Sequence, residues 1–367
     1  MKALCIGGAM IDTIAIVDSD RIERMTMTNA DKDFLLIEEG RKVEAHEIST
    51  HVGGGAVNAA VCMARQGVDV ATLVKVGQDA RAETVFNLLL AERVSTRWVM
   101  RDQRAPTGAS VMLSSHDRNA AIFTFRGANT LLEPSDLKAE AFAVDLVYVA
   151  SLSNESADAF PAIVAEARRA GALVATNPGV RQLASRGGAM QEQLKDIDVL
   201  AINAAEAGTM VPALVARFGE ARPSSPAPAS SGGLPRLVQR GFSSGTHDMA
   251  FASFFAALRR LGTRYTVVTD GRHGAFVGTD DAILHCPGLA AQVAGTAGAG
   301  DAFNATFAVQ LAGGAAPGDA LRAAVVNAAS VVGFVDTQTG LLAGDELARR
   351  VRDLTPSLPL SEWRQAV

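Results

Sequence analysis

Short apolar runs and helical patterns alternate along nearly the whole chain of 367 residues. The run KALCIGG, residues 2–8, is closed by glycines and is typical of a buried parallel strand. The next helical pattern, residues 56–67, places Val57, Val61 and Ala64 on one face. A strand–helix–strand order favours a parallel sheet covered by helices on both sides. We therefore predict an α/β, doubly wound, mainly parallel sheet flanked by helices, with ligands at the carboxyl ends of its strands.

The same two patterns recur further along the chain. They predict strands within residues 68–77, 145–152, 172–179, 198–203 and 264–271, and helices within residues 79–92, 157–171 and 299–312. Two regions lack this alternation of strand and helix patterns.

The first of these regions shows a period of two. Apolar residues such as Ile48 alternate there with polar ones such as His46 and Ser49, a pattern typical of half-exposed antiparallel strands. A small protruding sheet formed from about residues 12–50 and 104–127 would explain the alternation. We predict that this sheet acts as a lid over the ligand site.

The second region, residues 219–248, is rich in Pro, Ser, Ala and Gly. This composition indicates a long loop or mobile insert, too polar and too broken to pack well. We expect it to be dispensable for the chemistry.

The composition excludes several classes of protein. A formal net charge of −5 disfavours nucleic acid as the main partner, because phosphate backbones need a basic surface. The three cysteines are far apart and show no zinc-site or disulfide spacing, which favours a reducing compartment. Asp12 interrupts the N-terminal apolar stretch, and no run of eighteen apolar residues follows, so we expect no signal peptide and no membrane span. We predict a cytoplasmic location.

Small residues surround one carboxylate in the stretch GTAGAGDAFNATF. Gly298, Ala299 and Gly300 directly precede Asp301, and a helical stripe follows at Phe303, Phe307 and Leu311. Asp301 would lie in the first turn of this helix, where free N–H groups and the helix dipole favour an anion. On this stretch alone, Asp301 is equally well explained as an ordinary helix cap.

A second glycine cluster, GGGAVN at residues 53–58, opens the predicted helix that contains Val57. It lacks the GxGxxG spacing of dinucleotide-binding proteins, and the chain contains neither a Walker A motif nor the HRD and DFG motifs of protein kinases.

Together, GGGAVNAAVCMARQG near the N-terminus and GTAGAGDAF near the C-terminus resemble the two signatures of the ribokinase or PfkB-type carbohydrate kinase family. PTGASVMLS, FRGANTLLEPSDL, INAAEA and VVTDGRHGAF also follow in the family's order, so the resemblance covers nearly the whole chain except the insert. It implies a ribokinase-like fold and the ATP-dependent phosphorylation of a hydroxymethyl group on a small sugar.

The resemblance also implies roles for particular residues. Asp301 would be the base that accepts the proton of the attacking hydroxyl, and the Gly298, Ala299 and Gly300 turn would form an anion hole for the γ-phosphate. The NAAE stretch matches the family's NxxE motif, in which Asn203 and Glu206 would organise the Mg²⁺ that is bound with ATP.

The remaining site residues follow from the same resemblance. The substrate pocket would be lined by Asp12, Gly53, Gly54 and Asn58. The nucleotide would be bordered by Thr269, Asp270, Gly271 and Gly274, and Asn129 matches a polar position near the phosphates. Asn327 would lie beside adenine or would simply be a polar residue on a helix face.

Departures from the family pattern affect the choice of acceptor. Ribokinases carry a lysine where this chain has Gly55, so ribose itself is in question. Lys42, Arg104 and Arg126 are candidates for binding a phosphorylated sugar. The lid stretch FLLIEEG is apolar enough to cover a purine, so a nucleoside kinase is the main alternative. A non-catalytic sugar sensor is disfavoured by the intact GAGD and NxxE motifs.

A further departure concerns a monovalent cation. Many family members carry an aspartate where this chain has Gly295, and that carboxylate helps to bind K⁺. Asp336 or Thr337 are candidates to compensate, and we predict weak or no activation by K⁺. Lids of this family often form dimer contacts, so a homodimer through the lid is also expected.

Overall fold

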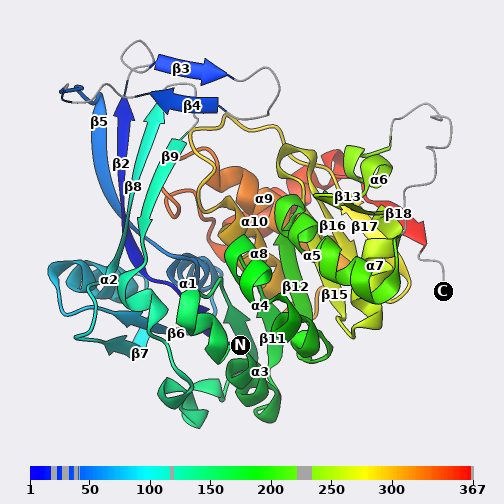
Figure 1. Ribbon diagram of the computed structural model, residues 1–367, viewed down its shortest axis with the longest axis horizontal. Helices are drawn as coiled ribbons and strands as arrows, with labels where there is room; N and C mark the ends of the chain where they lie inside the picture. The colour runs from blue at the N-terminus through cyan, green and yellow to red at the C-terminus, as the bar shows by residue number, and fades with distance from the viewer. Residues whose placement is uncertain are drawn as a thin grey trace.

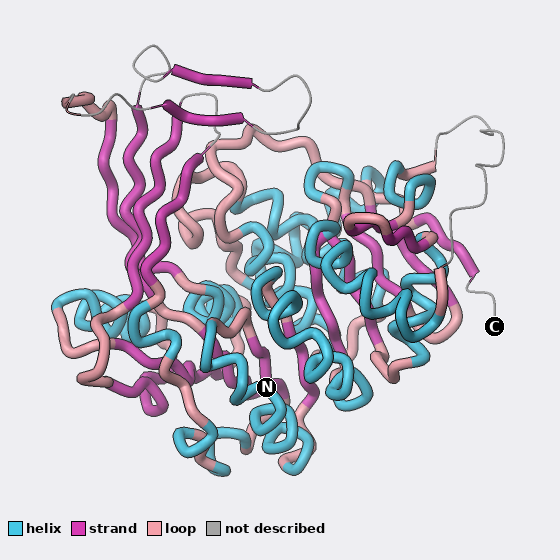
Figure 2. The backbone as a smooth tube through the Cα atoms, viewed as in Figure 1, coloured by secondary structure: helices cyan, strands magenta, loops and turns pink. Residues whose placement is uncertain are grey.

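The computed structural model describes residues 1–17, 23–26, 33–36, 40, 42–115, 120–220 and 234–364. Ten strands form one large sheet, shown in Figures 1 and 2. In spatial order they are β18 (Ser361–Arg364), β17 (Ala282–Cys286), β16 (Ala275–Gly278), β15 (Tyr265–Thr269), β12 (Val199–Asn203), β11 (Leu173–Thr176), β10 (Leu146–Val149), β1 (Lys2–Gly7), β6 (Asp69–Val76) and β7 (Ser95–Arg101). Strands β15 to β7 in this order are parallel, and β16, β17 and β18 add an antiparallel edge.

Helices cover both faces of this sheet. The α-helices are α1 (Gly55–Arg65), α2 (Ala80–Ala91), α3 (Phe160–Arg169), α4 (Val180–Gln193), α5 (Ala204–Phe218), α6 (Arg236–Arg240), α7 (Phe251–Arg260), α8 (Ala299–Ala312), α9 (Pro317–Val331) and α10 (Gly344–Leu354). Short 3₁₀ helices are η2 (Gly127–Thr130), η3 (Pro134–Asp136), η4 (Ala139–Phe142), η5 (Asn154–Ala159), η6 (Leu194–Asp196), η7 (Gly271–His273) and η8 (Thr355–Ser357). No helix of the described ranges has both the length and the apolar character that crossing a bilayer requires.

The core divides into one apolar cluster on each side of the sheet. Along β1, Ala3 and Cys5 belong to the cluster shared with α1, α8 and α9, whereas Leu4 and Ile6 belong to the cluster shared with α3, α5 and α7. A strand buried on both faces needs a continuous apolar run instead of alternation, which explains the sequence KALCIG. The predicted doubly wound, mainly parallel α/β fold is confirmed.

A second sheet stands out from the large one at upper left in Figure 1. Its order is β5 (Glu47–Gly53), β2 (Met10–Val17), β8 (Gly108–Ser115) and β9 (Ala120–Phe125), and β3 (Glu23–Thr26) pairs separately with β4 (Asp33–Leu36). The expectation of purely antiparallel pairing is wrong, because β2 and β8 are parallel. Both strands leave the carboxyl edge of the large sheet, one after β1 and the other after β7, so they enter the second sheet in the same direction.

The predicted strand alternation around His46, Ile48 and Ser49 is also corrected. Strand β5 begins only at Glu47, and residues 42–46 form no strand. Ile48 is 67% exposed and pairs with Ala15 on the face of the lid sheet opposite to Asp12. Part of the FLLIEEG stretch, residues 37–39, lies outside the described residues.

The expectation that all of residues 219–248 form a loose insert is wrong for the described part from residue 234. This part contains α6 and a hairpin of β13 (Phe242–Ser244) and β14 (His247–Met249). Leu237 and Phe242 are buried in the core, and the Phe242 ring lies 4.2 Å from that of Phe254. A few apolar residues within this polar stretch, such as Leu237 and Phe242, anchor the segment to the core. Residues 221–233 lie outside the described residues.

Candidate active site

The turn before α8 brings backbone N–H groups and a carboxylate to one place. Gly298 caps the helix with φ 77°, and a Cβ there would lie 2.6 Å from the Cβ of Thr337, so only glycine fits. A Cβ on Gly300 would meet nothing within 4 Å, and Ala299 and Gly300 both line a cavity. Asp301 lies in the first turn of α8. The helix therefore presents free N–H groups to an open space that is suited to an anion.

Asp301 is held by Asn58 of α1. The Asn58 Nδ2 donates to Asp301 Oδ2 at 2.8 Å. Burial raises the pKa of Asp301 to about 6, the Asn58 hydrogen bond opposes this rise, and the charge of Asp12 adds to it. A carboxyl group with such a pKa can take up a proton near neutral pH, which is what general-base chemistry requires.

Asn58 is itself oriented by two donors that the sequence did not reveal. Thr337 Oγ1 donates to Asn58 Oδ1 at 2.9 Å, and Gln338 Nε2 donates to the same oxygen at 3.1 Å. Gln338 is buried and also donates to the Val52 carbonyl at 3.0 Å. These contacts fix which end of the Asn58 amide faces Asp301.

The GGG stretch makes room for Asp12. A Cβ on Gly53 would lie 1.9 Å from Asp12 Oδ2, and Gly54 has φ 99° with the Gly8 carbonyl oxygen 2.5 Å from its Cβ position. Ser110 Oγ donates to Asp12 Oδ1 at 2.5 Å, while burial raises the pKa of Asp12. Gly53 is thus required so that Asp12 can approach the start of α1, and Gly54 so that the β1–β2 turn can pack against it.

Gly55 lies directly beside Asp301. Its Cβ position is 3.0 Å from the Ala150 Cβ and 3.5 Å from Asp301 Oδ1. The predicted residues Asp12, Gly53, Gly54, Asn58 and Asp301 are therefore brought together at the carboxyl edge of the sheet, at the base of the lid.

A cavity of about 680 Å³ adjoins the α8 turn and is lined by Ala299, Gly300 and Phe303 of that helix. Of the predicted nucleotide residues, Thr269, Gly271 and Gly274 line it, and Asp270 stands between the first two in the chain. Its remaining wall is mainly apolar and was not predicted; it includes Leu289, Val293, Phe303, Val325 and Val332. A mostly apolar cavity with a few polar groups is typical of a small-molecule site.

Asn327 does not reach this cavity. It is fully buried, where its Nδ2 donates to Thr306 Oγ1 at 2.8 Å and its Oδ1 accepts from the Leu342 N–H at 3.0 Å. On α9, Val325 and Ala328 line the cavity instead. These contacts fit the alternative of a polar residue within the packed helix and do not support a place beside adenine.

Asn129 is also placed differently from its expectation. Its Oδ1 accepts from the Ala9 N–H at 2.9 Å, and its Nδ2 donates to the Ala9 carbonyl at 3.0 Å. This buried amide fastens the β1–β2 turn to η2. Asn129 therefore supports the base of the lid, and a contact with phosphates stays a prediction.

Asn203 and Glu206 form a capping box at the start of α5. Asn203 Oδ1 accepts from the Ala205 and Glu206 N–H groups at 2.9 Å, and Glu206 Oε2 accepts from the Asn203 N–H at 2.8 Å. Glu206 is buried, and its pKa is raised by burial, with a further contribution from the charge of Asp301. It is therefore no solvated surface charge, and it lies within electrostatic reach of Asp301.

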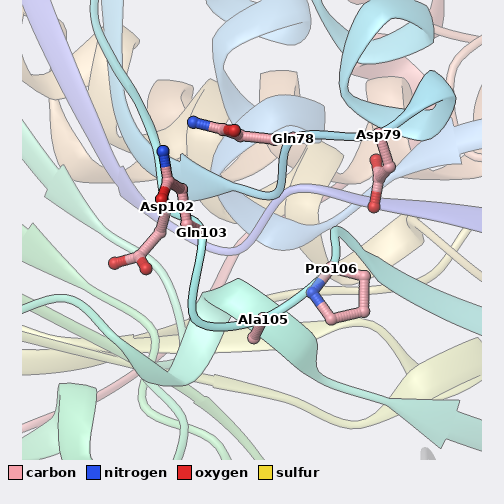
Figure 3. Close-up of a pocket in the computed structure, with 6 residues that line it drawn as sticks. All are labelled: Gln78, Asp79, Asp102, Gln103, Ala105 and Pro106. Carbon is pink, nitrogen blue, oxygen red and sulfur yellow. The ribbon is translucent and has the colours of Figure 1, made fainter.

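A second cavity of about 410 Å³, shown in Figure 3, lies at the base of the lid between the β6–α2 and β7–β8 loops. Its two carboxylates are already paired. Asp79 accepts from Thr107 Oγ1 at 2.7 Å, and Asp102 accepts from Arg104 Nη2 at 2.7 Å. The Asp79–Thr107 contact joins the two loops, whereas Asp102 and Arg104 both lie in the β7–β8 loop.

The three basic residues that could bind an anionic acceptor differ in the contacts they already make. Arg104 pairs with Asp102 and with Glu133, each at 2.7 Å, and is therefore occupied. Lys42 is exposed in an irregular segment. Arg126 is partly buried and donates to Ser153 Oγ at 2.6 Å.

Known proteins resemble this chain over most of its length. A family model described as pfkB family carbohydrate kinase matches residues 2–222 and 244–343. The deoxyribokinase of Salmonella typhi is 25% identical over 331 residues, which cover 89% of this chain and 94% of that protein. The interruption of the family match falls within the predicted insert.

Solved structures share the fold. The Arabidopsis thaliana ribokinase complexed with ribose and ATP superimposes with a TM-score of 0.69 at 19% identity, covering 96% of this chain and 98% of that one. The Burkholderia thailandensis nucleoside kinase in complex with inosine gives 0.70 at 16% identity, covering 98% and 100%. The chain belongs to the pfkB family of carbohydrate kinases, a family of phosphotransferases that use ATP.

Proposed function

We propose that this protein transfers the γ-phosphoryl group of ATP to a hydroxymethyl group of a small sugar. The observation that carries the proposal is the position of Asp301. It lies in the first turn of α8, beside the N–H groups that adjoin the larger cavity, and within electrostatic reach of Asp12 at the lid. A hydroxyl hydrogen-bonded by Asp12 would meet the base and the phosphate at one point.

The reaction would run as an in-line displacement. The acceptor oxygen forms a bond to the γ-phosphorus as the bond from that phosphorus to the bridging oxygen of ADP breaks. Asp301 takes the proton of the attacking hydroxyl, and the N–H groups of Ala299, Gly300 and Asp301 receive the growing negative charge on the phosphoryl oxygens.

A hydrated Mg²⁺ fits beside α5. Mg²⁺ prefers oxygen ligands and keeps several waters. Glu206 is a buried carboxylate that can accept hydrogen bonds from such waters, while the Asn203 Oδ1 is engaged with backbone N–H groups. We therefore expect Glu206 to hold the ion through water, and Asn203 to position Glu206. The ion would neutralise phosphate charge.

We propose little or no dependence on K⁺. A Cβ on Gly295 would lie 3.0 Å from the Phe334 carbonyl oxygen, so this position is close-packed and lacks a carboxylate. The two candidates for compensation are engaged elsewhere. Asp336 Oδ1 accepts from the Gln338 and Thr339 N–H groups, and Thr337 donates to Asn58.

The outer face of the lid supports a homodimer. Ile48, Val111, Phe123 and Phe125 share the face opposite to Asp12, and their exposed fractions are 67%, 44%, 63% and 52%. A second copy of the chain would cover this apolar face. Sedimentation of the wild type and of Phe123→Lys tests the pairing, and a wild type that sediments as a monomer would contradict it.

Three buried free cysteines suit a reducing compartment, and we propose the cytoplasm.

The decisive experiment is a phosphorylation screen with ATP across pentoses, hexoses, keto-acid sugars and nucleosides, with Asp301→Asn as the matched variant. The variant keeps the shape and removes the base, so kcat should fall by ~10² to 10⁴-fold while ATP affinity changes little. A nucleoside with a kcat/KM far above that of every sugar would favour the nucleoside kinase alternative. A wild type inactive on every acceptor would favour a non-catalytic sensor.

A further inference from the structure

Two arginines beside the acceptor site have no carboxylate partner among the described residues. Arg126 is partly buried and its Nη1 donates to Ser153 Oγ at 2.6 Å, yet among the described residues no carboxylate lies within 4 Å of it or of Arg181. Burial, and then the positive charge of Arg181, lowers the pKa of Arg126. Since a guanidinium stays protonated, the two arginines carry like charges within electrostatic reach of each other.

Arg126 lies at the base of the lid, where the lid joins the acceptor site. It directly follows β9, and a Cβ on Gly108 would lie 3.0 Å from the Arg126 carbonyl oxygen. Gly108 pairs with Met10 at the start of β2, the strand that carries Asp12. From this position the Arg126 side chain reaches across to Ser153 in the loop after β10.

The loop that receives Arg126 runs alongside the catalytic centre. It begins at Ala150, whose Cβ is 3.0 Å from the Cβ position of Gly55, and that position is 3.5 Å from Asp301 Oδ1. Three residues span at most about 11 Å, so Ser153 lies within that distance of Ala150. Arg126 therefore contacts a loop that begins next to the catalytic centre.

Arg181 approaches the same loop from α4. Its neighbour Gln182 accepts from the Leu152 N–H at 3.0 Å, and a Cβ on Gly179 would lie 2.5 Å from Ser151 Oγ. Arg181 is exposed and lies in the first turn of α4. Arg126 thus contacts this loop from the lid base, and the start of α4, which carries Arg181, contacts the same loop through Gly179 and Gln182.

We propose that Arg126 and Arg181 form an anion subsite, and that the preferred acceptor is a sugar bearing a carboxylate or phosphate group remote from the hydroxymethyl that is phosphorylated. This inference rests on the proposed function and names its substrate class. The anion would relieve the repulsion between the guanidinium groups and accept charge-assisted hydrogen bonds from both. Asp12 would hold the hydroxyls between the two ends.

The test compares acceptors of equal chain length that differ only in charge. Steady-state kinetics would be measured on a neutral hexose, its aldonic or 2-keto acid, and its phosphate monoester. We expect one anionic acceptor to exceed the neutral sugar in kcat/KM by ~10-fold or more. Preference for the acid or for the phosphate ester would each support the subsite and would identify which anion it takes.

Variants separate the subsite from general effects. Arg126→Gln and Arg181→Gln should each lower kcat/KM for the anionic acceptor by ~10- to 100-fold, mainly through KM, and change it within about twofold for the neutral sugar. Arg126→Lys should recover part of the loss. Arg186→Gln is the matched control, because Arg186 lies on the same helix but pairs with Asp158.

Other outcomes would overturn the inference. Equal or better use of neutral sugars by the wild type, or a rise in the KM of ATP without a rise in that of the acceptor in Arg126→Gln, would assign the arginines to another role. If the wild type phosphorylates nothing, the proposed function fails instead. Calorimetric binding of the sugar acid and the sugar phosphate to the wild type and to Arg126→Gln then tests the subsite alone, and equal or absent binding would overturn it.

Discussion

Gln338→Leu should make the enzyme more sensitive to acid without removing any group that touches substrate. Gln338 and Thr337 both donate to Asn58 Oδ1, and Asn58 Nδ2 in turn donates to Asp301. That last bond stabilises the charged carboxylate, so it holds the pKa of Asp301 below the value that burial alone would produce. Loosening Asn58 should therefore raise the pKa from about 6.

The size of the shift follows from the hydrogen bond. A bond to a charged group contributes about 1.5–3 kcal/mol, and 1.36 kcal/mol corresponds to one pKa unit, so complete loss would raise the pKa by about one to two units. Gln338 is one of two donors that orient Asn58. We therefore expect Gln338→Leu to raise the pKa that defines the acid limb of the kcat/KM profile by ~0.5–1 unit. At pH 6.5 the fraction of Asp301 that is ionised would then fall up to about threefold, while activity at pH 8 would change little.

The assay is the pH dependence of kcat/KM for the acceptor at saturating Mg-ATP. The terminal phosphate of ATP also titrates near pH 6, so the comparison is between variants that share this contribution. Thr337→Val should shift the limb in the same direction, and Thr337→Ser should not. Gln66→Leu is the control for a Gln-to-Leu change, because the Gln66 side chain contacts Thr306 and not Asn58. Superimposable acid limbs in folded Gln338→Leu and wild type would refute the reasoning, as would a downward shift.

Gly53→Ala should raise the KM of the acceptor by ~10-fold or more and leave ATP binding unchanged, because its Cβ would lie 1.9 Å from Asp12 Oδ2 and displace it; an unchanged acceptor KM would contradict this. Replacing residues 222–232 by a short Gly/Ser linker should leave kcat near wild type, since loop length has a weak entropic cost. Phe242→Ala, by contrast, should lower the unfolding free energy by ~3–5 kcal/mol in denaturant titrations, because Phe242 is core. Adding KCl at constant ionic strength should change kcat/KM by less than about tenfold, and a larger rise would show that an ion site survives at Gly295.

Much of the architecture could be predicted from the sequence because it depends on local patterns. Continuous apolar runs such as that of β1 specify strands buried on both faces, and helical periodicity around Val57 specifies α1. Asp301 could be singled out for the same reason, since small residues and a helix start are adjacent to it in the chain. The resemblance of these motifs to a known family then placed Asp12 and Asn58 in the same site.

Tertiary structure decided what depends on contacts between distant segments. The parallel pairing of β2 with β8 follows from where both strands leave the large sheet, which no local alternation encodes. Asn327 has a polar side chain that could bind a ligand, yet packing turns its amide toward Thr306. Whether an arginine is free to meet an anion depends on which carboxylates fold beside it, so only the folded chain separates Arg126 from Arg104. The sequence identifies the charged side chains, but the fold determines their partners.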